Sequence, residues 1–73
     1  MTKIAIDTNI LLYSIDKDNE FKRKISIELI EQNPFIFNQN LSEFINVLLN
    51  RWKYPKGNLS SIIAAVLDSC VLV

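Results

Sequence analysis

The 73-residue sequence contains no histidine, one cysteine, one glycine and two prolines. Without histidine, a Cys–His catalytic pair and a Cys–His zinc site are excluded. Cys70 has no second cysteine with which to form an internal disulfide, so we expect a buried, reduced thiol. Because glycine and proline are scarce, a disordered or low-complexity chain is also excluded.

The sequence also lacks an excess of either charge and any long hydrophobic run. Eight basic residues balance eight acidic ones, so the chain as a whole is not a basic nucleic-acid-binding domain. The cluster at residues 22–24 (KRK) is either a solvated helix face or a local phosphate contact. No apolar run approaches the about 20 residues of a membrane span, and the N-terminus lacks a signal-peptide pattern. We therefore predict a cytoplasmic protein with no membrane association.

Hydrophobic residues are, in contrast, abundant for so short a chain, at 49% of the total. The length allows a single domain, residues 1–73, with a marginal core of its own. A small domain has much surface, so part of this apolar material is expected to contact another copy, another protein or a further part of the same domain.

The hydrophobic pattern predicts strands and helices in alternation. Three short β-prone apolar runs predict strands at residues 3–6, 35–37 and 70–73. Helical periodicity predicts four helices, at residues 10–14, 20–32, 41–53 and 59–69. The first is expected to be capped by Thr8 or Asn9, the second by Asp18 or Asn19, and the fourth by Asn58. Strands joined by crossover helices form parallel sheets. We therefore predict a three-layer α/β domain, with a three-stranded parallel sheet flanked by about four helices.

Two carboxylates are expected at the same edge of this sheet. Asp7 follows the first predicted strand, and Glu43 lies early in the helix that follows the second. Ligands bind at the carboxyl ends of parallel strands, and Mg²⁺ or Mn²⁺ is often held by one or two carboxylates with water. Asp7 and Glu43 are therefore candidate metal ligands and catalytic residues, with Thr8 and Asn9 in support. The alternative is structural: either acid can cap or stabilise a helix start.

The sequence as a whole resembles the PIN-domain ribonucleases, in particular the VapC-type toxins of toxin–antitoxin pairs. The resemblance lies in residues 4–13 (IAIDTNILLY) and 39–48 (QNLSEFINVL). It implies a Mg²⁺- or Mn²⁺-dependent endoribonuclease in which Asp7 and Glu43 bind the metal and Thr8 and Asn9 match the polar residues after the aspartate. It also implies an RNA substrate, an antitoxin partner and a homodimer.

Family members are longer, and their second half supplies further metal-binding aspartates, for which this sequence has no match. The chain is therefore expected to be the amino-terminal portion of a truncated PIN-like domain, weak or inactive by itself. The alternative is a non-catalytic half-domain that dimerises or binds an antitoxin. A haloacid-dehalogenase-like phosphotransferase is disfavoured, because that family has a second aspartate at the position of Asn9.

Overall fold

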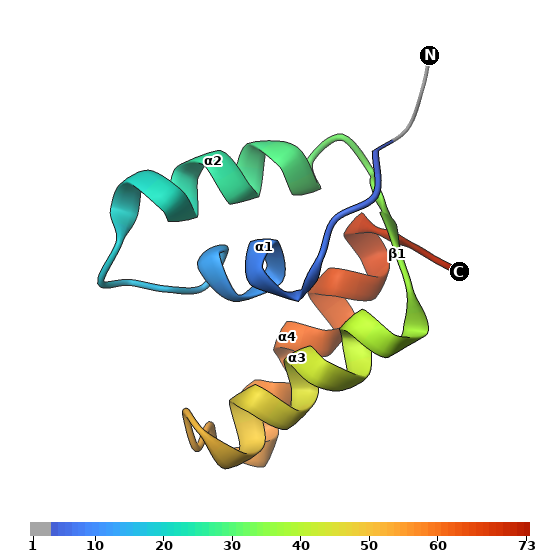
Figure 1. The fold of residues 1–73 in the computed structure, drawn as a ribbon. Helices are drawn as coiled ribbons and strands as arrows, with labels where there is room; N and C mark the ends of the chain where they lie inside the picture. The colour runs from blue at the N-terminus through green and yellow to red at the C-terminus, as the bar shows by residue number, and fades with distance from the viewer. Residues whose placement is uncertain (1–3) are drawn as a thin grey trace.

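Helices make up most of the molecule, and the sheet is small (Figure 1). The computed structural model describes residues 4–73. The elements follow in the order α1 (Thr8–Tyr13), α2 (Glu20–Ile30), β1 (Phe35–Ile36), α3 (Asn38–Asn50), α4 (Lys56–Ser69) and β2 (Val71–Leu72). No helix among residues 4–73 is long and apolar enough to cross a membrane.

The predicted three-stranded sheet of a three-layer α/β domain is wrong, because the described residues form a sheet of two strands, β1 and β2. These two strands are parallel, as predicted, with Phe35 opposite Val71 and Ile36 opposite Leu72. The first predicted strand contributes a single isolated parallel bridge, from Ala5 to Phe35. Lys3, the first residue of that predicted strand, lies outside the described residues.

Two local constraints explain why pairing with the first segment stops so early. Phe35 donates its N–H to the Ile4 carbonyl at 2.8 Å and accepts from the Ile6 N–H at 3.0 Å. The next residue before Phe35 whose backbone would face the first segment is Asn33, and its positive φ of 56° takes it out of the extended conformation. After Ile6 the chain enters α1 at Thr8, so the next residues make helical hydrogen bonds in place of ladder bonds. The first segment is therefore extended but too short to form a strand.

The helix boundaries follow the local signals in part. Asn19 caps α2 as expected, its side chain accepting from the Lys22 N–H at 3.1 Å. Helix α2 ends before Asn33, whose positive φ of 56° is a conformation that asparagine tolerates. Helix α3 begins at Asn38, earlier than the predicted residue 41. Helix α4 begins at Lys56 after Pro55, so the expected cap by Asn58 is wrong.

The core lies between α1, α3, α4 and the short strands. Its buried members come from the three helices, from β1 and from the segments beside them: Ile6, Leu11, Ile36, Leu41, Phe44, Leu48, Leu59, Val66 and Cys70. Phe44 is the largest side chain that is fully buried. Burial removes water from the Cys70 thiol and raises its pKa above the ordinary value of 9.0, in keeping with the predicted inert thiol.

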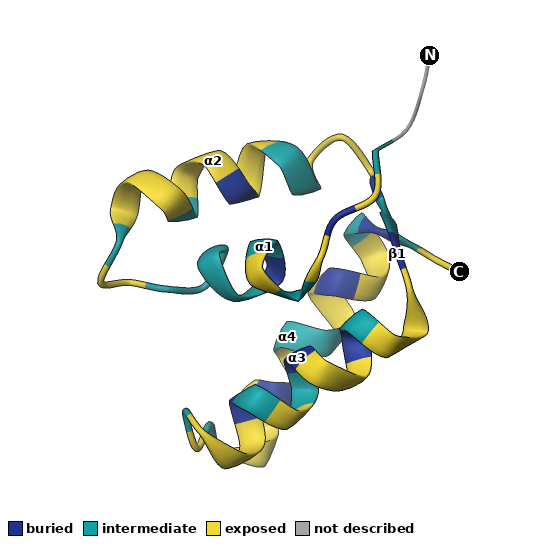
Figure 2. Ribbon diagram, viewed as in Figure 1, coloured by how far each residue is buried: buried dark blue, intermediate teal, exposed yellow. Residues whose placement is uncertain are grey.

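Helix α2 buries a different face from the one its apolar residues predict. The spacing of Phe21, Ile25 and Leu29 predicts a core-facing stripe, yet Phe21 is 76% exposed and Ile25 is 42% exposed. The buried residue of this helix is Ser26. Figure 2 shows α2 largely exposed, and it packs mainly against α1. The predicted stripe is therefore wrong for Phe21 and Ile25, and the apolar surface of α2 faces solvent.

Replacing Phe44 with alanine tests the position of the core. The substitution removes the largest buried side chain and leaves a cavity, so we expect a loss of about 3–5 kcal/mol in the free energy of unfolding. That loss is comparable to the whole stability of a small domain. Urea denaturation followed by circular dichroism measures it. Leu49→Ala, on the solvent side of the same helix, is the control and should cost less than half as much. Equal losses would contradict this core.

Candidate functional site

Asp7 stands at the junction between the buried Ile6 and helix α1. Its backbone is extended, with φ −100° and ψ 179°, and its Oδ1 accepts a hydrogen bond from the Ile10 N–H at 3.1 Å. Asp7 is therefore the N-cap of α1, a position predicted for Thr8 or Asn9. The carboxylate is exposed, so capping through Oδ1 leaves it in contact with solvent. A structural role for Asp7 is thus present in the fold.

Glu43 lies deeper in its helix than the sequence suggested. Because α3 begins at Asn38, Glu43 belongs to the second turn, and the first turn of α3 holds no acidic residue. The favourable effect of the helix dipole on a carboxylate falls off within the first turn. Stabilisation of a helix start therefore does not account for Glu43.

Thr8 connects the two carboxylate-bearing elements. Its hydroxyl donates to Glu43 Oε2 at 3.0 Å, and the Asn40 carbonyl lies 3.4 Å from the same hydroxyl oxygen. The Asn40 side-chain amide donates back to Thr8 Oγ1 at 3.5 Å, and Gln39 Nε2 donates to Glu43 Oε1 at 3.5 Å. These bonds hold the first residue of α1 against the first half of α3. They also orient both oxygens of the Glu43 carboxylate.

Asp7 and Glu43 line one surface hollow of about 400 Å³, which we call the acidic hollow. The sequence predicted that these two carboxylates would meet at one edge, and the structure brings them together there with Thr8 and Asn9. The rest of the lining comes from α1, α3 and the residue that follows α3: Leu12, Asn40, Asn46, Val47 and Arg51. The two carboxylates therefore share the hollow with hydroxyl and amide groups and with one cationic side chain, that of Arg51.

Sequence reasoning did not identify Asn40, Asn46 and Arg51 as members of this site. A helical spacing would have indicated two of them, because Asn46 and Arg51 follow Glu43 by three and eight residues and so share its face. Asn46 also accepts a hydrogen bond from the Asn50 side chain, one turn further along α3. Asn40 depends on the contact between α1 and α3, which is non-local and gives no pattern in the sequence.

The oxygen atoms that line the acidic hollow are suitable ligands for a hard divalent cation. Carboxylate, hydroxyl and amide oxygens are the ligands of Mg²⁺ and Mn²⁺, and Mg²⁺ commonly keeps several waters beside one or two carboxylates. Among residues 4–73 no group of three or more acidic, histidine or cysteine side chains converges on one point. The residues present therefore fit a two-carboxylate, water-rich site, with Asp7 and Glu43 as the charged ligands.

No protein-family model matches the chain, and no curated protein matches it significantly.

Two substitutions at Asp7 separate its capping role from its charge. Asparagine is as good an N-cap as aspartate, whereas alanine offers no acceptor. We expect Asp7→Ala to lower the free energy of unfolding by about 1 kcal/mol and Asp7→Asn to change it by less than about 0.5 kcal/mol. Urea denaturation at neutral pH compares the two variants. Equal destabilisation by both would show that the Asp7 charge, and not the cap, stabilises the fold.

Proposed function

We propose that the chain carries the amino-terminal part of a metal-dependent endoribonuclease centre of the PIN-domain, VapC-toxin type. The observation that supports this most strongly is the acidic hollow itself, where Asp7 and Glu43 meet although 36 positions apart in the sequence. The two segments that resemble the family, residues 4–13 and 39–48, are the segments that meet there. RNA is the proposed substrate, and Mg²⁺ or Mn²⁺ the proposed cofactor.

Each residue of the hollow has a role in this proposal. Asp7 and Glu43 hold the cation, Thr8 fixes the orientation of Glu43 through the 3.0 Å hydrogen bond, and Asn9 supplies a further polar group. Arg51, which also lines the hollow, contacts an RNA phosphate in this proposal. A bound divalent cation supplies Lewis-acid activation of a phosphodiester and of water. The chain's own contribution is to bind the strand and to hold two carboxylates in place.

Two carboxylates are few for a hydrolytic metal centre, so we expect weak metal affinity and weak or no cleavage by the 73-residue chain alone. The proposed setting is a reducing cytoplasm, in keeping with the single buried thiol. The proposed protein partners are a second copy of the chain and an antitoxin.

Charge-neutral variants of the two carboxylates test the proposal. Asp7→Asn retains the cap and Glu43→Gln retains an acceptor for Thr8, so both are expected to fold. We expect each variant to weaken Mn²⁺ binding, measured by titration calorimetry, at least roughly tenfold, since loss of even an indirect metal partner has such an effect. Any Mn²⁺-dependent cleavage of a fluorogenic RNA should fall in parallel.

The control is Asp68→Asn, which removes an exposed carboxylate of α4 outside the acidic hollow and should leave both readouts unchanged. Mn²⁺ binding that is insensitive to Asp7→Asn and Glu43→Gln would falsify the metal site. Robust cleavage by the wild-type chain would refute only the expectation of weak activity.

A second candidate function is that of a non-catalytic interaction module. The observation that favours it is the solvent-facing apolar surface of α2, where Phe21 and Ile25, one helical turn apart, are 76% and 42% exposed. Apolar side chains grouped on one exposed face are typical of surfaces that bind another protein. In this alternative the chain uses α2 to bind a second copy of itself, and the acidic hollow has no catalytic role.

Light scattering coupled to size exclusion tests the self-association. We expect the wild-type chain at micromolar concentration to show a mass above the 8.4 kDa of one chain. Phe21→Ser removes the most exposed apolar side chain of α2 and should return the mass to that of the monomer. Leu49→Ser, which alters an exposed leucine of α3, is the matched control and should not. A wild-type monomer at every concentration rules the module out.

A further inference from the structure

The connection between α3 and α4 alternates basic and aromatic side chains. Its residues are, in order, Arg51, Trp52, Lys53, Tyr54 and Pro55, and Lys56 is the first residue of α4. Arg51, Lys53 and Lys56 are exposed, whereas Trp52 and Tyr54 are half-buried. The sequence from residue 44 to residue 67 holds these three basic residues and no acidic one. A local positive surface therefore exists on a chain whose net charge is zero.

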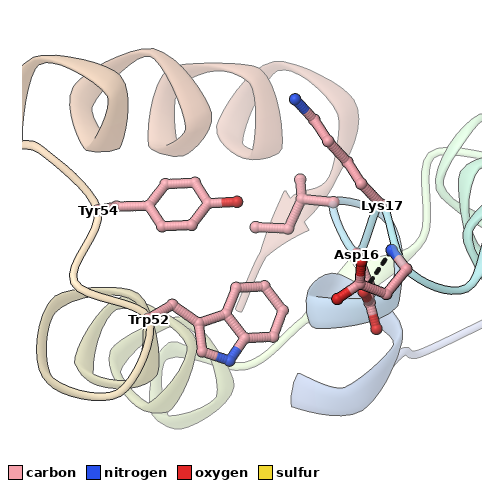
Figure 3. Close-up of a pocket in the computed structure, with 6 residues that line it drawn as sticks. Asp16, Lys17, Trp52 and Tyr54 are labelled. Atoms are coloured by element: carbon pink, nitrogen blue, oxygen red, sulfur yellow. Dashed lines mark hydrogen bonds between the residues drawn. The ribbon is translucent and has the colours of Figure 1, made fainter.

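The two aromatic rings of this connection line a second hollow, which we call the aromatic hollow. It measures about 520 Å³, and the other side is formed by the loop between α1 and α2, with Ile15, Asp16, Lys17 and Asp18. The Trp52 and Tyr54 ring centroids lie 6.1 Å apart with the planes inclined at 35°. Figure 3 shows both rings extending from the α3–α4 connection toward the loop that carries Asp16 and Lys17.

Aromatic side chains beside basic ones are suited to single-stranded nucleic acid. Unpaired bases stack on aromatic rings, while lysine and arginine contact the phosphates. The aromatic hollow presents ring surface from Trp52 and Tyr54, and Lys17 also lines it. Arg51 and Lys53 are the sequence neighbours of these two rings. Duplex bases are already stacked and offer no free face, so this arrangement discriminates against double strands.

The carboxylates of the aromatic hollow determine which bases it favours. Asp16 Oδ1 accepts from the Asp18 N–H at 3.0 Å, an interaction within the loop that fixes the Asp16 side chain. Carboxylate oxygens accept hydrogen bonds only, and the exocyclic amino groups of cytosine, adenine and guanine are donors. Uracil has no exocyclic amino group, and its N3–H donor stands between two carbonyl oxygens that repel a carboxylate. The hollow therefore favours an amino-bearing base over uracil.

The aromatic hollow and the acidic hollow adjoin. Arg51 lines the acidic hollow and Trp52, the next residue, lines the aromatic one. On the facing side, Leu12 lines the first and Ile15, one helical turn later, lines the second. The acidic hollow is thus lined by α1 and α3, and the aromatic hollow by the segments that follow these two helices. A strand held in one can continue into the other past Arg51.

We propose that the aromatic hollow binds an unpaired, amino-bearing base of single-stranded RNA and leads the adjoining backbone along Lys53 and Arg51 to the acidic hollow. The inference deepens the proposed function and rests on it for the choice of RNA. Trp52 and Tyr54 stack on the base, and Asp16 and Asp18 accept from its amino group.

Fluorescence of Trp52, the single tryptophan of the chain, reports directly on this site. The full chain is titrated with a short oligocytidine RNA in EDTA, so that binding is measured without metal or cleavage. We expect saturable quenching of Trp52 emission and an affinity that falls as salt is raised. Oligouridine should bind more weakly than oligocytidine, and an RNA duplex more weakly than either.

Variants then assign the binding to named side chains, with fluorescence anisotropy of labelled oligocytidine as the readout. Tyr54→Leu should weaken binding roughly 5- to 100-fold, the range for loss of one base–aromatic stack, whereas Tyr54→Phe should retain it. Lys53→Asn removes the charge at a residue whose φ of 53° asparagine tolerates, and should reduce the salt slope by about one. Phe37→Leu and Lys24→Gln, at exposed positions outside both hollows, are the matched controls.

The outcomes for this inference are separable from those for the proposed function. Asp68→Asn, at an exposed position outside both hollows, should bind oligocytidine in EDTA as tightly as the wild type. No binding by the wild type, binding unaffected by Tyr54→Leu and Lys53→Asn, or equal affinity for oligouridine or for duplex would overturn the inference. Metal-dependent activity that needs Asp7 would stand in each of those cases. Conversely, oligocytidine binding without Mn²⁺ binding would contradict the proposed nuclease function and support the proposed base site.

Discussion

The constraint on which the rest of the structure depends is the abrupt change from extended chain to helix at Asp7. By accepting the Ile10 N–H, the Asp7 side chain starts α1 directly after Ile6. That start ends the pairing of the first segment with β1 and turns Thr8 toward α3, where its hydroxyl reaches Glu43 and Asn40. It also directs Leu11 into the core. One hydrogen bond of the cap thus links the small sheet, the contact between α1 and α3, and the acidic hollow.

The same carboxylate has two uses that are chemically compatible. A cap requires one acceptor oxygen, and a carboxylate has two oxygens with several lone pairs, so Asp7 can cap α1 and still bind a cation. Glu43 differs, because both of its oxygens accept from neighbouring side chains, Thr8 and Gln39. These donors are neutral, so they orient the Glu43 carboxylate without neutralising it. The Asp7 carboxylate is therefore held by a backbone N–H of α1, whereas the Glu43 carboxylate is held by two side chains.

The surface of the chain has three regions with different chemistry. The acidic hollow lies at α1 and α3, the aromatic hollow is lined by the segments that follow these helices, and charged residues line both. The apolar side chains of α2 form the third region. A substrate strand and a protein partner have different physical requirements, namely charge and stacking for the first and apolar area for the second. The chain therefore has the means to contact both at once.

Much of the local structure was predictable because its causes are local. Asn19 caps α2 through its own side chain, Asn33 and Pro34 end that helix, and the apolar run at residue 35 forms a strand parallel to the one at residue 71. The meeting of Asp7 and Glu43 was also predictable, because the carboxyl ends of parallel segments lie at one edge. The extra helical turn that moves Glu43 into the second turn of α3 was not, since Asn38 gives no distinct start signal.

The sequence by itself determined where α2 begins, that β1 and β2 run parallel, and which two carboxylates share an edge. Only the tertiary structure decided the extent of the sheet, the face that α2 buries and the membership of Asn40 and Arg51 in the acidic hollow. Periodicity shows that α2 has an apolar stripe, but whether that stripe meets the core depends on how α2 packs against α1. The physical reason is range: caps and turns are fixed by neighbours in the chain, whereas pairing and burial depend on which distant surfaces meet.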